Sequence, residues 1–292
     1  MKFKNIALIG KYQSDEVTDQ VIELAQYLQN VDFNVYVDCG SHCALNSNFA
    51  KLQTGLIKEW LNILDLVIVI GGDGTLLSAA RGIVEHEIPI IGINQGKLGF
   101  MTDIAIENMI ESINNILLEN NYNIESRSLI NAKIIRNNKI IRENVALNDV
   151  VISRGSIGNM IEFDISVDSD FVLSQKSDGV IFSTPTGSTA YSLAAGGPIM
   201  HPGSNVISMV PICPQSLSNR PIVLPDTAII EFLLVRENAT QIHFDGQECY
   251  NLQYKDRVIL SKHSKEFKII HPSNYNYYYT LRNKLDWSKR LS

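Results

Sequence analysis

The chain has 292 residues, 45% of them hydrophobic, and a formal net charge of -6. This length and apolar content allow one large domain or two ordinary ones, and we expect two. The acidic balance argues against general binding to nucleic acids or anionic membranes. Neither a membrane-spanning apolar run nor a secretory signal is present, so we expect a cytoplasmic protein whose partners are small molecules.

The first part of the chain alternates short apolar runs with amphipathic segments. Strands are predicted at 5–10, 34–37, 66–70 and 89–93, and helices at 15–30, 52–61, 75–86 and 106–119. Strands separated by helices indicate a doubly wound, mainly parallel α/β sheet. We therefore predict an α/β N-terminal domain over 1–122.

The strand predicted at 66–70 runs directly into a glycine-rich turn, Gly71, Gly72, Asp73, Gly74 and Thr75. Glycines let a phosphate donor approach the backbone, and the N–H groups that open the next helix attract anions. A carboxylate beside phosphates is unfavourable unless it accepts a proton or helps to hold a metal ion. The turn favours a phosphate-donor site, although Asp73 could instead be an ordinary helix cap. Neither a P-loop nor a dinucleotide fingerprint is present.

Another glycine-rich loop spans 94–102 and contains Phe100, which could stack on a base or lie in the core. Beyond residue 122 the pattern changes to short β-branched runs separated by polar turns. Antiparallel strands are predicted at 129–136, 139–146, 149–153, 161–167, 229–235 and 257–260, and a hairpin turn at Asn137 and Asn138. These runs predict a mostly antiparallel all-β domain over 123–270.

The segment 183–192 contains seven hydroxyl side chains, together with one proline and one glycine typical of a tight turn, Pro185 and Gly187. Hydroxyl groups can donate to and accept from a sugar or a base, and a helix opening at Thr189 would direct N–H groups at a ligand. The alternative is a turn-rich connection between strands. Its composition favours a ligand-binding loop.

Two further features have structural explanations. Cys39, His42 and Cys43 are close in sequence, but the remaining ligands of a zinc site are not apparent, and the four cysteines should stay reduced in the cytoplasm. The C-terminal segment, 271–292, combines four tyrosines with basic residues and could be a nucleic-acid patch. We expect it instead to pack back onto the N-terminal domain.

Taken in order, these motifs resemble the NAD kinase family over nearly the whole chain. The matching segments are 71–75, 98–102, 147–150, 177–179, 184–192, 245–247 and 281–287. The first turn alone is weak evidence, because diacylglycerol, sphingosine and phosphofructo-kinases carry similar turns. The ordered set is strong evidence.

The resemblance implies phosphoryl transfer from ATP to the 2′-hydroxyl of the adenosine ribose of NAD, which gives NADP. It implies that Asp73 accepts the proton and that a divalent metal ion, Mg or Mn, arrives with the phosphate donor. The implied phosphate- and NAD-binding residues are Gly71, Gly72, Asp73, Gly74, Thr75, Phe100, Asn148, Asp149, Lys176, Asp178, Thr189, Ala190, Tyr191, Ser192, Leu193, Ala194, Asp245 and Gln247. Asp149 departs from the glutamate of many members, which draws the carboxyl group back by one methylene.

The family also implies a homo-oligomer, expected to be a homotetramer. Two alternatives stay open at the level of the residues: a lipid or sphingoid kinase with the same glycine-rich turn, and a sensor that binds NAD or NADP without turnover. A lipid substrate would need an apolar cleft, whereas 183–192 is rich in hydroxyl groups. The preferred phosphate donor, the preference between NAD and NADH, the physiological metal and feedback regulation are not readable from the sequence.

Overall fold

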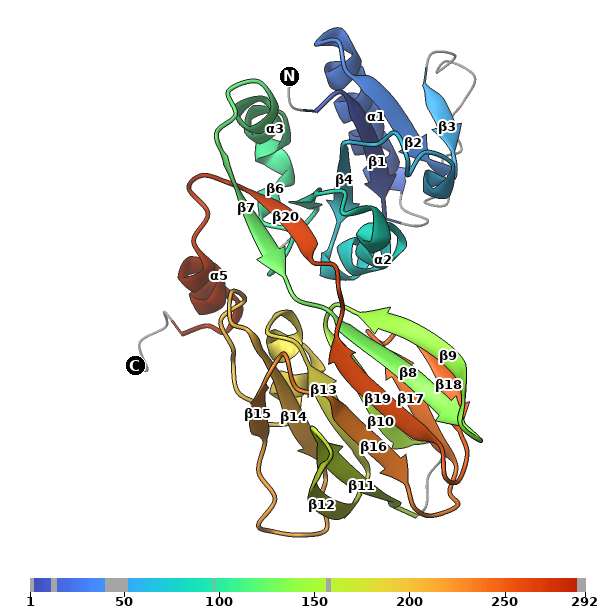
Figure 1. The fold of residues 1–292 in the computed structure, drawn as a ribbon. Helices are drawn as coiled ribbons and strands as arrows, with labels where there is room; N and C mark the ends of the chain where they lie inside the picture. Colours follow the sequence, from blue (N-terminus) through green and yellow to red (C-terminus); the bar gives the residue numbers. More distant parts are fainter. Residues whose placement is uncertain (1–2, 12–14, 40–51, 97, 156–158, 288–292) are drawn as a thin grey trace. The chain divides into compact units, whose positions relative to one another are not determined.

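The computed structural model describes residues 3–11, 15–39, 52–96, 98–155 and 159–287. The chain forms two compact units (Figure 1). Unit 1 combines residues 1–126 with 267–292, and unit 2 contains residues 127–266. The sequence placed the boundaries at 122/123 and 270/271. The structure places them at 126/127 and 266/267, because the strands at both crossings belong to the sheet of unit 1.

In the described part of unit 1, one sheet has the strand order β3-β2-β1-β4-β5-β20-β7, with β6 beside β5. The strands β1 to β6 pair in parallel, as does β20 with β5. The bounds are β1 (Asn5–Gly10), β2 (Asn34–Asp38), β3 (Gln53–Gly55), β4 (Leu66–Gly71), β5 (Ile90–Asn94), β6 (Ile104–Ala105), β7 (Tyr122–Arg127) and β20 (Phe267–Pro272). The predicted, mainly parallel α/β sheet is confirmed.

Helices cover the sheet because its strands alternate buried apolar side chains between two faces. Residues of α1 (Asp15–Asn30) and α3 (Met109–Leu117) share one core with Leu66, Ile68 and Ile70 of β4. The helix α2 (Asp73–Ile83) packs beside Gly92 of β5, where an added Cβ would lie 2.8 Å from Leu76. The short helices are η2 (Ile57–Glu59), η3 (Val84–His86) and η4 (Ile106–Asn108), and α5 (Tyr277–Lys284) follows β20.

The helix predicted at 52–61 is wrong, because this segment forms β3 and the single turn η2. Gly55 lies against Trp60, where an added Cβ would be 2.8 Å from the ring. The Trp60 ring in turn contacts Tyr36 at 5.2 Å between centroids, and the Asp38 carboxylate accepts the N–H of Ile57 at 2.9 Å. Contacts with β2 therefore outweigh the local helical periodicity.

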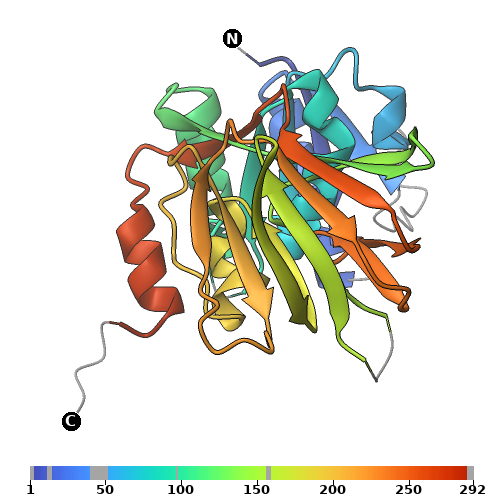
Figure 2. The same ribbon diagram turned by 60° about the horizontal axis from the view of Figure 1, so that its bottom comes forward.

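Unit 2 is a sandwich of two six-stranded sheets within the described residues, with the orders β15-β14-β13-β10-β17-β18 and β12-β11-β16-β19-β8-β9. Side chains of both sheets form one core, in which the rings of Phe163 and Phe232 stack at 4.8 Å. Figure 2 shows these strands from a second side. The strands are β8 (Ile130–Arg136), β9 (Lys139–Ala146), β10 (Asp149–Arg154), β11 (Ile161–Val167), β12 (Asp170–Ser177), β13 (Gly179–Ser183), β14 (Val206–Ile212), β15 (Ile222–Pro225), β16 (Ile230–Leu234), β17 (Thr240–Phe244), β18 (Glu248–Leu252) and β19 (Arg257–Lys262).

The printed strand pairs of unit 2 are antiparallel, which confirms the predicted all-β domain. The predicted turn between β8 and β9 is also confirmed, since Asn137 and Asn138 have φ of 51° and 59°, as a type I′ hairpin requires. The predicted helix at Thr189 is reduced to a 3₁₀ turn, η5 (Thr186–Thr189), and the four residues of α4 (Tyr191–Ala194).

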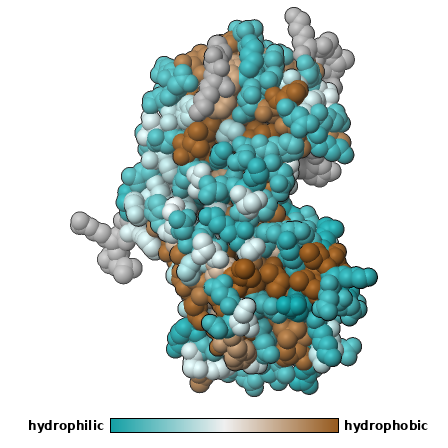
Figure 3. Space-filling model, viewed as in Figure 1, coloured by the Kyte–Doolittle hydropathy of each residue, from teal (hydrophilic) through white to brown (hydrophobic). Residues whose placement is uncertain are grey.

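Some apolar side chains of unit 2 remain on the surface, and hydrophobic patches are visible on that unit (Figure 3). The exposed apolar side chains of this unit include Ile140 and Ile141 on β9 and Phe171 and Val172 on β12. These two strands lie at opposite edges of one sheet. In the part of the chain that the structure describes, no helix combines the length and apolar character that a membrane crossing requires.

Candidate active site

The glycine-rich turn of unit 1 lies at the carboxyl end of β4, where it opens α2. Gly72 caps the helix with extended backbone, and Asp73 is its first residue. In the strand order of this sheet, β1 and β4 are neighbours. Ligands of open α/β sheets bind at such carboxyl ends, beside the point where the strand order reverses. The fold thus places the predicted donor turn at an edge suited to an anion.

Packing in the fold requires a glycine at one of the three glycine positions of the turn, but not at the other two. A Cβ on Gly71 would lie 2.7 Å from Thr75 Oγ1, so packing within the turn requires glycine there. A Cβ on Gly72 or Gly74 would meet no atom within 4 Å, and neither residue has a positive φ. The fold places no such demand on these two positions. Their open backbone is what a closely approaching phosphate would need.

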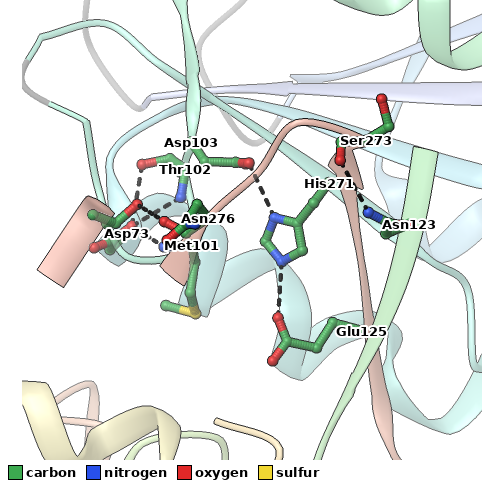
Figure 4. A network of polar contacts seen from close by, with 10 residues as sticks. Asp73, Met101, Thr102, Asp103, Asn123, Glu125, His271, Ser273 and Asn276 are labelled. Carbon is green, nitrogen blue, oxygen red and sulfur yellow. Dashed lines mark hydrogen bonds and ion pairs between the residues drawn. The ribbon is translucent and has the colours of Figure 1, made fainter. Parts of the chain in front are cut away.

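The Asp73 carboxylate is held by three consecutive backbone N–H groups of the loop 98–102 (Figure 4). Phe100 donates to Oδ2 at 2.9 Å, and Met101 and Thr102 donate to Oδ1 at 3.0 and 3.1 Å. The Thr102 hydroxyl also lies 3.1 Å from Oδ1. Because each carboxylate oxygen has two lone pairs, Oδ2 is the atom with room for a further donor.

Gly99 lets this loop close on Asp73. A Cβ on Gly99 would lie 2.1 Å from Asp73 Oδ1 and 2.3 Å from Thr102 Oγ1. In the sequence, this loop stands out because of Phe100. In the structure, its backbone N–H groups bind the Asp73 carboxylate. The Phe100 side chain is half-buried, and its predicted stacking on a ligand ring stays a prediction.

In unit 2, a second aspartate holds the segment 147–149 in the same way. Asp245 accepts the N–H groups of Leu147, Asn148 and Asp149 at 3.0, 2.7 and 3.1 Å. Asp245 and Gly246 occupy the turn between β17 and β18 with φ of 52° and 64°. Two predicted motifs that lie far apart in sequence are thereby joined through one carboxylate.

The hydroxyl-rich loop joins the same cluster. Thr184 donates from its N–H to Asn148 O at 2.9 Å and from its hydroxyl to Leu147 O at 2.5 Å. Gly187 passes so close that a Cβ would lie 2.1 Å from Asn148 O. The buried guanidinium of Arg127 donates to Thr186 Oγ1 at 3.3 Å. Many of the loop's polar groups therefore serve the fold.

A cavity of about 420 Å³ lies beside these segments in unit 2. Five of its lining residues were predicted from the sequence, namely Asn148, Asp149, Ala190, Tyr191 and Asp245. Four were missed, namely Val151, Ser153, His243 and Gly246. Strand alternation is the signal that identifies three of the four: Val151 and Ser153 follow Asp149 at intervals of two, and His243 precedes Asp245 by two.

The other residues predicted for unit 2 do not line this cavity. Lys176 forms an ion pair with Glu162 at 3.3 Å, and Asp178 forms one with Arg154 at 3.1 Å. The remaining ones are Thr189, Ser192, Leu193, Ala194 and Gln247. Ser192 is fully buried, so its side chain serves the local packing.

Asp149 has the most perturbed carboxyl group of the site. Its side chain is 5% exposed. Burial, with a smaller contribution from the charge of Asp245, raises the pKa of Asp149 from 3.8 to about 7. Near neutral pH this group can therefore be either a hydrogen-bond donor or an acceptor toward a ligand.

Of the three residues considered for a zinc site, the structure describes one. Cys39 is exposed, whereas His42 and Cys43 lie outside the described residues. Among the residues that are described, no group of three or more His, Cys, Asp or Glu side chains is arranged to hold a metal ion.

Comparison with known proteins gives matches over almost the entire chain. The model of the ATP-NAD kinase N-terminal domain matches residues 6–122, and that of the ATP-NAD kinase C-terminal domain matches residues 147–272. A relative named NAD kinase from Laribacter hongkongensis is 45% identical over 289 residues, which cover 99% of this chain and 98% of the relative. Another from Neisseria gonorrhoeae is 45% identical over 292 residues, with 99% and 98% coverage.

Two solved structures share the fold. A yeast NADH kinase complexed with NADH aligns with a TM-score of 0.91 at 24% identity, over 100% of this chain and 91% of that chain. An NAD kinase from Archaeoglobus fulgidus in complex with ATP aligns with a TM-score of 0.74 at 22% identity, over 97% and 98% of the two chains.

Proposed function

The chain belongs to the ATP-NAD kinase family, and from that membership we propose how its residues transfer a phosphoryl group from ATP to the 2′-hydroxyl of the adenosine ribose of NAD. The protein is a phosphotransferase whose product is NADP. A lipid kinase and a sensor without turnover, the two alternatives, are set aside, because family models match both the α/β part and the β-rich part of the chain.

In this proposal, the glycine-rich turn of unit 1 holds the phosphates of the donor. The open space where a Cβ would lie at Gly72 and Gly74 supports this role, since N–H groups at the start of a helix attract anions. A divalent metal ion, Mg or Mn, would enter with the donor phosphates and neutralise part of their charge during transfer.

The cavity of unit 2 is the proposed NAD site. Its lining combines carboxyl groups, an amide and hydroxyls with apolar surface from Val151 and Ala190. Such a mixture suits a nucleoside, whose hydroxyls and base edges need polar partners and whose rings need apolar contact. Tyr191, which is 48% exposed, offers a ring against which a base could stack.

The observation that carries the proposal is the fixed Asp73 carboxylate with free acceptor capacity on Oδ2. We propose that Oδ2 orients the ribose 2′-hydroxyl and accepts its proton late in the transfer. Phosphoryl transfer depends mainly on positioning and charge neutralisation, so proton removal contributes a smaller share.

The test is NADP formation by the purified protein with ATP, Mg and NAD, compared between wild type and Asp73→Asn. General-base assistance is worth about 10²–10⁴-fold, and we expect kcat to fall by that factor while NAD binding is kept. Asp19→Asn, an exposed aspartate on α1, is the matched control. An almost unchanged kcat in Asp73→Asn would contradict the assignment of Asp73 as the proton acceptor. Loss of both NAD binding and turnover would point to a metal-binding or positioning role.

The remaining proposals concern the setting of the enzyme. We propose a cytoplasmic homo-oligomer, expected to be a homotetramer, as the family resemblance implies. Apolar side chains exposed on the edge strands β9 and β12 support an assembly of this kind.

A further inference from the structure

His271 of β20 lies between two carboxylates within unit 1 (Figure 4). Its Nδ1 is 3.1 Å from Asp103 Oδ2, and its Nε2 is 3.2 Å from Glu125 Oε2 on β7. The imidazole is 1% exposed and stacks on the Tyr275 ring at 3.9 Å with an interplanar angle of 7°. None of these residues belongs to the proposed donor turn or NAD cavity.

The charges around His271 explain why a histidine suits this place. The Asp103 side chain is only 6% exposed, and a buried carboxylate is costly unless a cation or a donor compensates it. Glu125 approaches from the other side, and Tyr275 covers a ring face. A histidine ring places one nitrogen toward each of the two carboxylates, so an N–H of the ring can be directed at Asp103 or at Glu125.

Asp103 follows directly on the residue that binds Asp73. Thr102 is completely buried and contacts Asp73 Oδ1 through both its N–H and its hydroxyl, and Asn94 donates to the same hydroxyl at 2.7 Å. The adjacent side chain of Asp103 points to His271. The end of the loop 98–102 is thus attached on one side to Asp73 and on the other to His271.

We propose that His271 is a positioning residue, which holds the loop 98–102 through Asp103 and thereby fixes the orientation of the Asp73 carboxylate. The inference rests on the proposed function insofar as Asp73 is the proton acceptor. Its structural part, control of the loop by His271, stands independently. A misplacement of about 1 Å at a reacting group can cost about 10²-fold in rate, so the contact matters to turnover.

The first experiment measures amide hydrogen exchange of Phe100, Met101 and Thr102 in His271→Leu and His271→Gln. Exchange should be about tenfold faster in His271→Leu than in wild type, and His271→Gln, which keeps one donor for Asp103, should lie between them. Amides of β4 serve as the internal reference for global unfolding. His86→Gln, an exposed histidine of the same unit, is the matched control and should change nothing.

The second experiment measures kinetics on the same proteins and on Glu125→Gln, which keeps the size of the side chain and is the fallback if the His271 variants do not fold. We expect kcat to fall about 10- to 100-fold in the His271 variants, with KM for ATP and for NAD within about twofold. Glu125→Gln should show a smaller change in the same direction.

The outcomes separate this inference from the proposed function. Unchanged exchange of the three loop amides in a folded His271→Leu protein would overturn the inference, whatever the activity. Faster loop exchange with a wild type that forms no NADP would support control of the loop by His271 and count against the kinase chemistry assigned to Asp73. Raised KM values with unchanged kcat would overturn the link from His271 to Asp73.

Discussion

Asp73 and Asp245 act alike at the residue scale: each carboxylate accepts N–H groups from three consecutive residues of a distant segment. The partners lie 27 to 29 residues from Asp73 and 96 to 98 residues from Asp245. The sequence marks both aspartates as ligand contacts. It does not reveal their anchoring role, because backbone N–H groups carry no sequence signature and only the tertiary fold brings them together.

Asp149 gives a prediction for the pH dependence of stability. With a folded-state pKa raised from 3.8 to about 7, the folded chain binds a proton that the unfolded chain lacks between those values. The contribution of this group to the free energy of unfolding is therefore largest at low pH and is lost as the pH rises through about 7.

Asp149→Asn removes that titration and keeps the size of the side chain. The free energy of unfolding of the variant should rise relative to that of the wild type as the pH increases. We expect this relative gain to be on the order of 2–4 kcal/mol from pH 4 to pH 8. Urea unfolding across this range measures the difference, and Asp170→Asn, an exposed aspartate of β12, is the control. A stability difference that does not vary with pH would show that Asp149 does not titrate in this window.

At the scale of elements, alanine substitutions of glycines in two loops can distinguish an effect on ligand binding from an effect on the fold. Gly74 has open space around it, so Gly74→Ala should leave the fold intact or add up to about 0.5–1 kcal/mol through its helical position. The new methyl group should nevertheless obstruct the donor phosphates and raise KM for ATP. Unchanged affinity for ATP would argue that the donor does not approach this turn.

Gly99→Ala is the contrasting change. Its Cβ would collide with Asp73 Oδ1, so we expect the loop 98–102 to shift, the free energy of unfolding to fall by about 1–3 kcal/mol and kcat to drop. Thermal unfolding and initial-rate kinetics measure both effects. A variant with normal kcat would show that Asp73 tolerates displacement of this loop.

Predictions of elements succeed where local periodicity and tertiary packing agree. The helix α1 and the strand β11 have the predicted bounds, because their apolar period matches the face that they bury. The strands β1 and β9 also have the predicted bounds, although β1 is almost entirely buried and most of β9 is exposed. The segment 52–61 fails because the ring of Trp60 and the backbone of Gly55 are used by contacts with β2. Such contacts lie beyond any local pattern.

At the scale of the whole molecule, unit 1 is completed by the end of the chain. The strand β20 pairs with β5, and β7 lies at the end of the same sheet. A change of periodicity along the sequence marks where the β-rich part begins. It does not show which sheet the first and last strands of that part join, since pairing partners are distant in sequence.

Assembly is the prediction that belongs to this scale. With a chain mass of 32.6 kDa, a homotetramer should have a mass of about 130 kDa by light scattering after size-exclusion chromatography. Charged substitutions at Ile140 and Phe171 should lower the mass if the exposed edges β9 and β12 take part. A mass of 32.6 kDa for the wild type would contradict the homo-oligomer.

The sequence by itself determined the fold class, the family and the motifs that carry the chemistry, because periodicity and ordered short motifs are local properties. Only the tertiary structure decided that Asn148 and Asp149 line a cavity with His243. It also decided that Lys176 and Asp178 form ion pairs, and that His271 contacts Asp103, the residue after Thr102, which binds Asp73. The reason is physical: burial, hydrogen-bond partners and ion pairs are set by residues that meet only when distant strands and loops pack together.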